Sequence, residues 1–405
     1  MPEAVNSYDP RQDLSAYKDP GYTFLPSDLF EKFQASIQES QSLQLPLMWS
    51  LSLDQIIFKD LAELKNILIA GPPEIGKTNF IHQLILSLIA TKHPAQIKFV
   101  MFDFKSLDFS IYKSLKKHFI AQILGEENTV VSSINAASNT LNSLCIEMDN
   151  RYDLLKNAGT KNIFNYNDKF IARQLYPGLG HQYLPTLVLI IDELADLILF
   201  PQNEIPLRRL LYEGYKTGIY SIISTNQFLG ATLSNSILAS IEWRAIFRLY
   251  DKDDYRRFFD TIKTEHHISK GEFLYSENAH IHKGSTILIG QNDIEEITGF
   301  ISHQRGYQHA YLLPEYIDEN DLETKEFDIA DRDDLLEDAA RLIVQNQVGS
   351  TSLLQRRMKL GYNRAGRLMD QLEALGIVGP NQGSAARNVL LKTELELEKH
   401  LKTLK

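Results

Sequence analysis

The sequence predicts an α/β protein with a mostly parallel sheet covered by helices, followed by a small helical domain. Three observations predict this fold. Short apolar runs alternate with helical stretches over most of the chain, as in strands that are buried on both faces. A strongly acidic segment at 315–338 then interrupts this pattern. Three short helical patterns and a turn follow it, and this order is typical of a winged helix.

Each expected strand is a short apolar run. These runs lie at 66–70, 97–102, 187–191, 220–224 and 245–249, with a further strand-like run at 47–61. The helix after the first of them should end before Pro94. A long helix is expected at 132–157, closed by Gly159. Residues 271–302 contain two short apolar runs and are expected to be more β-like.

Beyond the acidic segment, the expected helices lie at 335–345, 351–360 and 363–375. A turn at 379–383 precedes a last extended segment at 388–391. In the final stretch, Leu397, Leu401 and Leu404 share one helical face, which is expected to dock on this small domain. The predicted parts are a lead-in at 1–45, an α/β domain at 46–314, an acidic linker at 315–334, a winged-helix domain at 335–392 and a helical tail at 393–405.

Composition excludes several classes of protein. With 43% hydrophobic and 23% charged residues, the chain can bury a core and is not disordered throughout. It has no apolar run of transmembrane length and no signal-peptide pattern, and its one cysteine, Cys145, cannot form a disulfide framework. A cytoplasmic protein is therefore expected.

Charge is distributed unevenly along the chain. The net charge is −10, and residues 315–338 carry all of it, with twelve acidic and two basic residues. Residues 350–392 instead hold seven basic and two acidic residues. An acidic linker before a basic module is compatible with DNA binding, but also with a solvated linker before an accessory domain.

A phosphate-binding motif follows the first strand of the α/β domain. Its residues, the candidates for nucleotide binding, are Gly71, Pro72, Pro73, Glu74, Ile75, Gly76, Lys77 and Thr78. The motif has a strand before it and a helix after it, as a Walker A loop requires. Backbone N–H groups would bind the phosphates, Lys77 would reach the β- and γ-phosphates, and Thr78 would ligate Mg²⁺. Glu74 stands where glycine is common and brings a carboxylate close to the phosphates.

The apolar strand at 187–191 ends in Asp192 and Glu193, which is a Walker B arrangement. Asp192 would hold Mg²⁺ through water, and Glu193 would polarise the attacking water. Alone, this pattern could equally be a core strand that ends in an acidic turn. Together with the Walker A loop it predicts an ATPase whose cofactors are ATP and Mg²⁺.

Several segments resemble one known family in order and spacing. They are 71–78, 101–105 (Met-Phe-Asp-Phe-Lys), 147–152, 165–167 and 191–197, and they are similar to the motor domain of the FtsK/SpoIIIE DNA translocases. Residues 355–378 resemble the γ winged-helix domain of the same family. The resemblance covers roughly 47–391, and the linked pair of domains is more specific than either part.

This resemblance implies a RecA-like P-loop ATPase that assembles as a homohexameric ring around double-stranded DNA and translocates it. The γ domain would read short oriented sequences and set direction, in the service of chromosome segregation at division. By the same resemblance, Asn226 takes the place of a glutamine that senses the γ-phosphate, and Gln227 could substitute for it. Lys252, Asp254 and Arg256 match a charged stretch after the fifth strand.

In the γ domain, Asn363, Arg364 and Arg367 match the base-reading positions of the third helix. Arginine can pair with guanine through two hydrogen bonds, and asparagine can do so with adenine. Lys359 and Arg387 are expected to meet phosphate. Without the resemblance, a basic helix that packs on its own motor is an equal alternative.

The sequence also departs from the family pattern. An N-terminal membrane domain is not present in it, so a septal or membrane partner would have to recruit the protein. Tyr215 stands where the family has an arginine, a candidate trans-acting finger, and Lys216, Arg208 or Arg209 could take that part. Two alternatives therefore stay open: a motor for conjugative or mobile-element DNA transfer, and a DNA-binding protein with a weakened nucleotide switch.

Overall fold

The structure is a computed structural model of the 405-residue chain. It describes residues 44–50, 55–105, 108–123, 128–226, 233–248, 252–259, 268–277, 280–286, 289–316, 333–358, 360, 362–380 and 386–403. The chain divides into two compact units. Unit 1 consists of 1–122, 127–138 and 184–311, and unit 2 consists of 123–126, 139–183 and 312–405. The domain limits expected from the sequence stay predictions.

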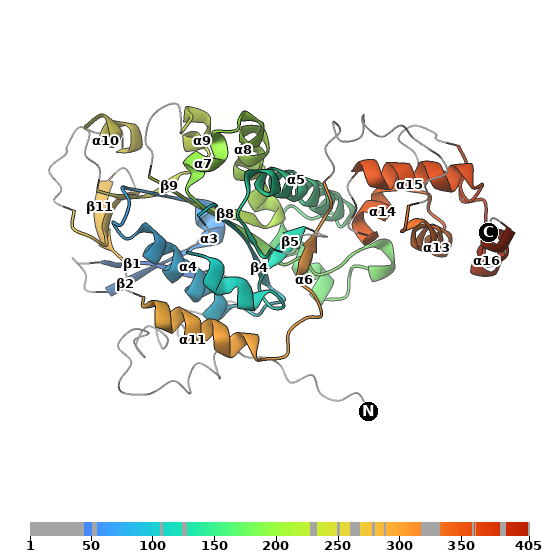
Figure 1. Cartoon of the computed structure of the whole chain (residues 1–405), viewed down its shortest axis with the longest axis horizontal. Helices are drawn as coiled ribbons and strands as arrows, with labels where there is room; N and C mark the ends of the chain where they lie inside the picture. The colour runs from blue at the N-terminus through green and yellow to red at the C-terminus, as the bar shows by residue number, and fades with distance from the viewer. Residues whose placement is uncertain are drawn as a thin grey trace. The chain divides into compact units, whose positions relative to one another are not determined.

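Unit 1 is built on a ten-stranded sheet of order β2-β1-β11-β10-β9-β3-β8-β7-β4-β6 (Figure 1). Six neighbouring strands are parallel: β9 (Trp243–Phe247), β3 (Asn66–Ala70), β8 (Ile219–Thr225), β7 (Thr186–Asp192), β4 (Ile97–Asp103) and β6 (Val130–Val131). Nearly every residue of β3, β8, β7 and β4 is buried, as expected for parallel strands with helices on both faces. Four of the five predicted apolar runs are confirmed as strands. The fifth, expected at 245–249, is confirmed as far as Phe247, and Leu249 lies outside the described residues.

The other four strands extend the sheet in antiparallel fashion: β10 (Glu272–Glu277), β11 (His280–Ser285), β1 (Gln44–Ser50) and β2 (Gln55–Asp60). The run at 47–61 is therefore two paired strands rather than one. The expectation of β structure up to residue 302 is wrong in its second half, where α11 (Gln291–Ser302) forms a helix. Its buried residues Ile294, Ile297 and Ile301 follow helical spacing, a signal that the strand-like run at 287–289 obscured.

Helices cover both faces of this sheet. In Figure 1, α4 and α11 lie on one side of it, and α7, α8 and α9 lie on the other. The remaining bounds in the α/β part are α3 (Leu61–Leu64), α4 (Lys77–Thr91), α5 (Ile134–Asn157), α6 (Ile163–Ile171), α7 (Leu194–Ile198), α8 (Glu204–Glu213), α9 (Asn235–Ala239) and α10 (Lys252–Phe259). Short 3₁₀ turns occupy 110–115, 177–179, 201–203 and 214–217, and β5 (Ala121–Ile123) pairs with β12 (Tyr311–Leu313).

Two predicted helix ends can be compared directly with the structure. Gly159 follows α5 with φ of 61°, in the left-handed region where glycine avoids a steric penalty. The predicted end at Gly159 is confirmed. The helix expected to end before Pro94 stops at Thr91, and Lys92 caps it in an extended conformation.

The C-terminal part of unit 2 consists of α13 (Leu336–Asn346), α14 (Thr351–Met358), α15 (Tyr362–Ala374) and α16 (Glu394–Thr403). The three predicted helices before the tail are confirmed within about two residues. The described part of the expected wing consists of single antiparallel bridges, Val378 to Val389 and Gly349 to Arg387. Leu397 is buried in the same core, and Leu401 packs against it, so the tail docks as predicted. Leu404 lies outside the described residues.

No helix within the described ranges is long and apolar enough to cross a membrane.

Candidate functional site

The phosphate-binding loop joins the end of β3 to the start of α4. Gly71 donates its N–H to the carbonyl of Thr225 at 3.2 Å, and a Cβ on Gly71 would lie 2.6 Å from the Cβ of Phe247. Gly76 has φ of 120°, and a Cβ there would lie 3.2 Å from the Cα of Gly271. Both motif glycines are therefore required by the backbone. Lys77 opens α4 and donates from Nζ to the carbonyl of Pro72 at 2.8 Å, across the loop.

Glu74 is exposed and has φ of 61°, so it adopts a left-handed conformation that glycine takes without strain. This explains why glycine is common at this position of the motif.

We expect Glu74→Gly to raise the free energy of unfolding by up to about 1 kcal/mol, because it removes this backbone strain. Glu74→Ala is the matched control, since it removes the carboxylate but keeps the strained φ. Thermal melting of the three proteins tests the prediction. An equal rise in both variants would assign the effect to the charge and contradict the backbone explanation.

The two Walker motifs meet because β8 lies between β3 and β7 in the sheet. The carboxyl ends of parallel strands share one edge of a sheet, so the loop after Ala70 and the acidic pair after Ile191 lie around the end of β8. The structure thus brings together the sequence-predicted residues Lys77, Asp192 and Glu193. Consistent with this, the pKa of the Lys77 ammonium is lowered by burial, and the negative charges of Glu193 and Asp192 oppose that shift.

β8 also orients the Walker B pair. The hydroxyl of Ser224 donates to Oδ1 of Asp192 at 2.7 Å and accepts the backbone N–H of Glu193 at 3.3 Å. The Glu193 carboxylate accepts from the Thr225 hydroxyl at 3.1 Å and from the backbone N–H of Asn226. Glu193 itself has φ of 63°, so these hydrogen bonds hold it in an unfavourable backbone conformation.

Burial raises the pKa of both carboxyl groups, Asp192 and Glu193, and hydrogen bonds from β8 partly oppose it. A raised pKa brings a carboxylate closer to the range in which it can take a proton. The backbone N–H of Asn226 donates to the Glu193 carboxylate. The role of the Asn226 side chain as a γ-phosphate sensor stays a prediction. Gln227 lies outside the described residues.

Two residues of the site, Asp103 and Lys105, carried no assigned role in the sequence interpretation. Asp103 ends β4 directly opposite Asp192, and it is fully buried. Its Oδ2 accepts the backbone N–H groups of Asp108 and Phe109, each at 3.0 Å. Burial raises the pKa of Asp192, and the charge of Lys105, two residues after Asp103, partly opposes that shift. Asp103 follows an apolar strand just as Asp192 does, so the same sequence pattern could have identified Asp103 as a site residue.

The residues present fit a magnesium ion, which prefers oxygen ligands. Thr78 offers a hydroxyl and Asp192 a carboxylate at the same edge of the sheet. Oδ1 of neighbouring Asp103 is buried and has no hydrogen-bond partner in the described part of the chain. No group of three or more histidine, cysteine or acidic side chains suited to a metal occurs there either.

The candidate finger residues lie on and after α8. The Tyr215 ring packs under the Nζ of Lys65 at 4.9 Å and that of Lys216 at 5.9 Å. Arg209 pairs weakly with Glu213 at 4.0 Å, and Arg208 is exposed. In α10, Arg256 pairs with Asp253, whereas the side chains of Lys252 and Asp254 lie outside the described residues.

The structure describes the side chains of only some of the predicted DNA-contacting residues. Lys359 and the side chain of Asn363 lie outside the described residues. Arg364 is held by Asp333 and Glu315, and Nε of Arg367 is buried without a hydrogen-bond partner within the described ranges. Contacts of these residues with DNA stay predictions.

Arg387 makes close contacts within the C-terminal domain. Its side chain is only 8% exposed, and it donates to Asp370 Oδ1 and Glu373 Oε2, both at 2.7 Å, and to the Met369 carbonyl at 3.0 Å. A phosphate contact would have to break these bonds. These contacts favour a role of Arg387 in the packing of the C-terminal domain, and its contact with phosphate stays a prediction.

Comparison with known proteins places these features in a family. The model of the FtsK/SpoIIIE family matches residues 32–230, and the model of the FtsK gamma domain matches residues 330–392. A DNA translocase FtsK of Chlorobaculum tepidum is 35% identical over 384 residues, which are 92% of this chain and 46% of the relative. A DNA translocase FtsK of Lactococcus lactis subsp. cremoris is 31% identical over 88% of this chain and 47% of its own length. The chain thus spans about half the length of these relatives.

Two solved structures show the same fold. The pCW3 conjugation coupling protein TcpA is 20% identical, with a TM-score of 0.52 over 65% of this chain and 72% of its own. The cytoplasmic domain of the type VII secretion ATPase EccC of Thermomonospora curvata is 16% identical, with a TM-score of 0.54 over 69% of this chain and 33% of its own. At this identity the likeness concerns the fold alone. The two family models and the identity to named relatives carry the assignment: the chain belongs to the FtsK/SpoIIIE family and joins its motor domain to an FtsK gamma domain.

Proposed function

We propose that this chain is an ATP-driven motor that translocates double-stranded DNA, with the γ domain orienting it on the duplex. The observation that carries this proposal is the convergence of Lys77, Asp192 and Glu193 at one sheet edge, in a chain that also holds a γ domain. We infer a role in chromosome segregation or DNA transfer, as the resemblance implies.

The hydrolytic step follows from the side chains present. The loop 71–76 would bind the phosphates of ATP through its backbone N–H groups, and Lys77 would neutralise their charge. Thr78 and Asp192 would hold Mg²⁺, which supplies further charge neutralisation when bound. Glu193 would accept the proton of the attacking water, since its carboxylate is fixed by Thr225 and Asn226.

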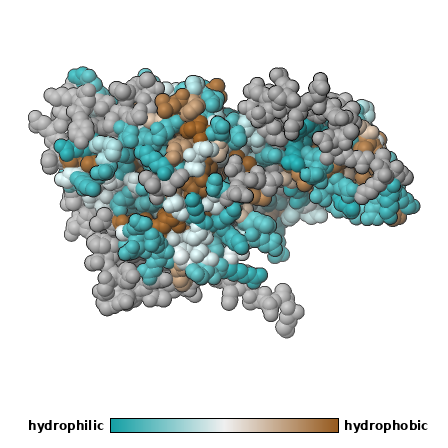
Figure 2. Space-filling view, viewed as in Figure 1, coloured by the Kyte–Doolittle hydropathy of each residue, from teal (hydrophilic) through white to brown (hydrophobic). Residues whose placement is uncertain are grey.

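Ring assembly is part of the proposal, and the surface of unit 1 supports an oligomer. The α7–α8 segment exposes Leu199, Ile205 and Tyr212 by 68–70% and Phe200 by 41%. Figure 2 shows apolar side chains gathered on the side of the molecule where these helices lie. Exposed apolar patches are typical of protein interfaces. Arg208 lies on the same helix and would face a neighbouring subunit, so it is our candidate for a trans-acting cation.

The test is ATP hydrolysis with and without long duplex DNA, using Lys77→Ala as the control. We expect DNA to stimulate hydrolysis and the variant to abolish it. Displacement of a third DNA strand from a triplex then distinguishes translocation from mere stimulation. Hydrolysis without any DNA effect would contradict the DNA motor. DNA binding without hydrolysis would favour the weakened nucleotide switch, which Tyr215 and Glu74 kept open.

A further inference from the structure

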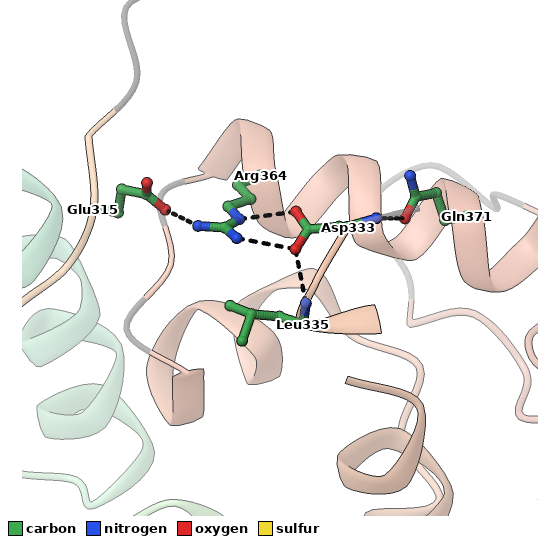
Figure 3. Close-up of polar contacts among 5 residues, drawn as sticks. All are labelled: Glu315, Asp333, Leu335, Arg364 and Gln371. Atoms are coloured by element: carbon green, nitrogen blue, oxygen red, sulfur yellow. Dashed lines mark hydrogen bonds and ion pairs between the residues drawn. The ribbon is translucent and has the colours of Figure 1, made fainter. Parts of the chain in front are cut away.

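Arg364 of α15 is engaged by two carboxylates from outside that helix (Figure 3). Its Nε donates to Asp333 Oδ2 at 2.8 Å, and its Nη2 donates to Asp333 Oδ1 at 3.0 Å. Its Nη1 donates to Glu315 Oε2 at 3.0 Å. We name Glu315, Asp333 and Arg364 the anion clasp. All three residues belong to unit 2.

The Asp333 arm of the clasp is held in place by the backbone. Asp333 Oδ1 accepts the N–H of Leu335 at 2.9 Å, and the backbone N–H of Asp333 donates to the side-chain oxygen of Gln371 at 3.3 Å (Figure 3). Gln371 lies on α15, two turns after Arg364. Asp333 is therefore fixed against the helix that is predicted to read DNA, and the clasp is not a chance meeting of mobile side chains.

The charges of the clasp are complementary. Burial acts to raise the pKa of Asp333, but hydrogen bonds from Arg364 and Leu335 lower it overall, and the nearby charge of Arg367 acts in the same direction. The hydrogen bonds that Arg364 donates to Asp333 raise the pKa of Arg364. Asp333 and Arg364 are thus both charged at neutral pH. Asp333 also faces a second arginine that the sequence assigns to base reading.

The Asp333 carboxylate accepts from Nε and Nη2 of Arg364, and these are N–H groups that DNA would use. Guanine binds an arginine through O6 and N7 in the same two-bond geometry, and a phosphate does so through two oxygens. Glu315 takes a third donor, so the clasp uses Nε, Nη1 and Nη2 together. Arg364 cannot make these bonds to DNA and to the clasp at the same time.

The clasp is also accessible. The side chains of Arg364, Asp333 and Glu315 are 22%, 15% and 23% exposed, whereas that of Arg387 is 8% exposed. Water reaches the clasp, so an incoming phosphate can compete for the arginine at a modest energetic cost. A fully buried network, by contrast, would act as permanent packing.

We propose that the anion clasp is an autoinhibitory contact, in which Asp333 and Glu315 mimic DNA and withhold Arg364 until duplex DNA displaces them. The inference rests on the proposed DNA binding of the γ domain. Under this proposal Glu315 and Asp333, which lie on either side of the segment 317–332, compete with DNA for Arg364.

The experiment measures the affinity of the full chain for a short labelled duplex by fluorescence anisotropy, without nucleotide. The test variant is Asp333→Asn with Glu315→Gln. The control is Asp334→Asn with Asp338→Asn, which changes the net charge equally at two exposed neighbours. We expect the test variant to bind about tenfold more tightly than the control at ~0.1 M salt, because the freed guanidinium of Arg364 gains one ionic contact with DNA. Its salt dependence should steepen by about one contact.

A third protein adds Arg364→Gln to the test variant, and the gain in affinity should then vanish. Glu315→Gln alone removes only the ion pair between Glu315 and Arg364 and leaves the Asp333–Leu335 hydrogen bond in place. It should give a smaller gain in DNA affinity. Equal affinity in the test and control variants overturns the clasp, as does a gain that survives Arg364→Gln. If the wild-type chain and every variant fail to bind the duplex, the proposed function falls, and the inference falls with it.

Discussion

Replacing Glu193 by glutamine is expected to lower the turnover number for ATP by roughly 10²–10⁴-fold, the usual contribution of a general base. Glutamine keeps the size of the side chain and can still accept the hydrogen bonds of Thr225 and Asn226 through its carbonyl oxygen. It cannot accept a proton from water. ATP binding should therefore persist, since Lys77 and the loop 71–76 are unchanged.

The measurement is single-turnover hydrolysis beside the equilibrium binding of a fluorescent ATP analogue. Unchanged hydrolysis would assign the base to another group, for which the neighbouring carboxylates Asp103 and Asp108 are available. Loss of binding together with hydrolysis would instead show that Glu193 holds the loop structure. Only loss of hydrolysis with retained binding agrees with the assigned role.

Thr225→Val makes a gentler change at the same carboxylate. The Thr225 hydroxyl stabilises the ionised form of Glu193 and so lowers its pKa, against the raising effect of burial. Without that hydroxyl the pKa of Glu193 rises further. Because the base must be ionised, we expect the acid limb of the rate–pH profile to move to higher pH. An unmoved limb in Thr225→Val would contradict the assignment of that limb to Glu193.

The sequence predicts the part of the site that is local along the chain. A phosphate loop needs glycines within a few residues of each other, so the requirement for Gly71 and Gly76 is visible in the motif itself. The same holds for Asp192 and Glu193 at the end of an apolar strand. The five central strands were predictable because parallel strands buried on both faces are continuous apolar runs.

What the sequence could not predict depends on register and on distant partners. Asp103 joins the site only because β4 pairs with β7 so that Asp103 lies opposite Asp192. Ser224 orients the acidic pair from a strand 32 residues away in sequence from Asp192. Arg364 and Arg387 looked alike as basic residues of a DNA-binding module. Both are held by two carboxylates that no local pattern specifies, and the structure distinguishes them by exposure, which is 22% for the side chain of Arg364 and 8% for that of Arg387.

Replacing Arg387 by glutamine is expected to destabilise the C-terminal domain by about 2 kcal/mol. Loss of one partner of a fully buried ion pair costs more, about 3–5 kcal/mol. The cost is smaller here because Asp370 and Glu373 are 67% and 37% exposed, so water can solvate them once the guanidinium is removed. The buried packing of the arginine stem and its bond to the Met369 carbonyl are lost in any case.

Both tryptophans, Trp49 and Trp243, lie outside the C-terminal domain, so tryptophan fluorescence does not report on its unfolding. Hydrogen exchange of peptides from 336–378 does so within the full chain. A loss of 2 kcal/mol corresponds to exchange about 30-fold faster where it proceeds through opening of the domain. Lys392→Gln is the matched control, because it removes one positive charge from an exposed side chain. If exchange is unchanged in Arg387→Gln while DNA affinity falls further than in the control, Arg387 contacts phosphate as the sequence first suggested. Faster exchange with equal DNA affinity in the two variants assigns Arg387 to the fold of the domain.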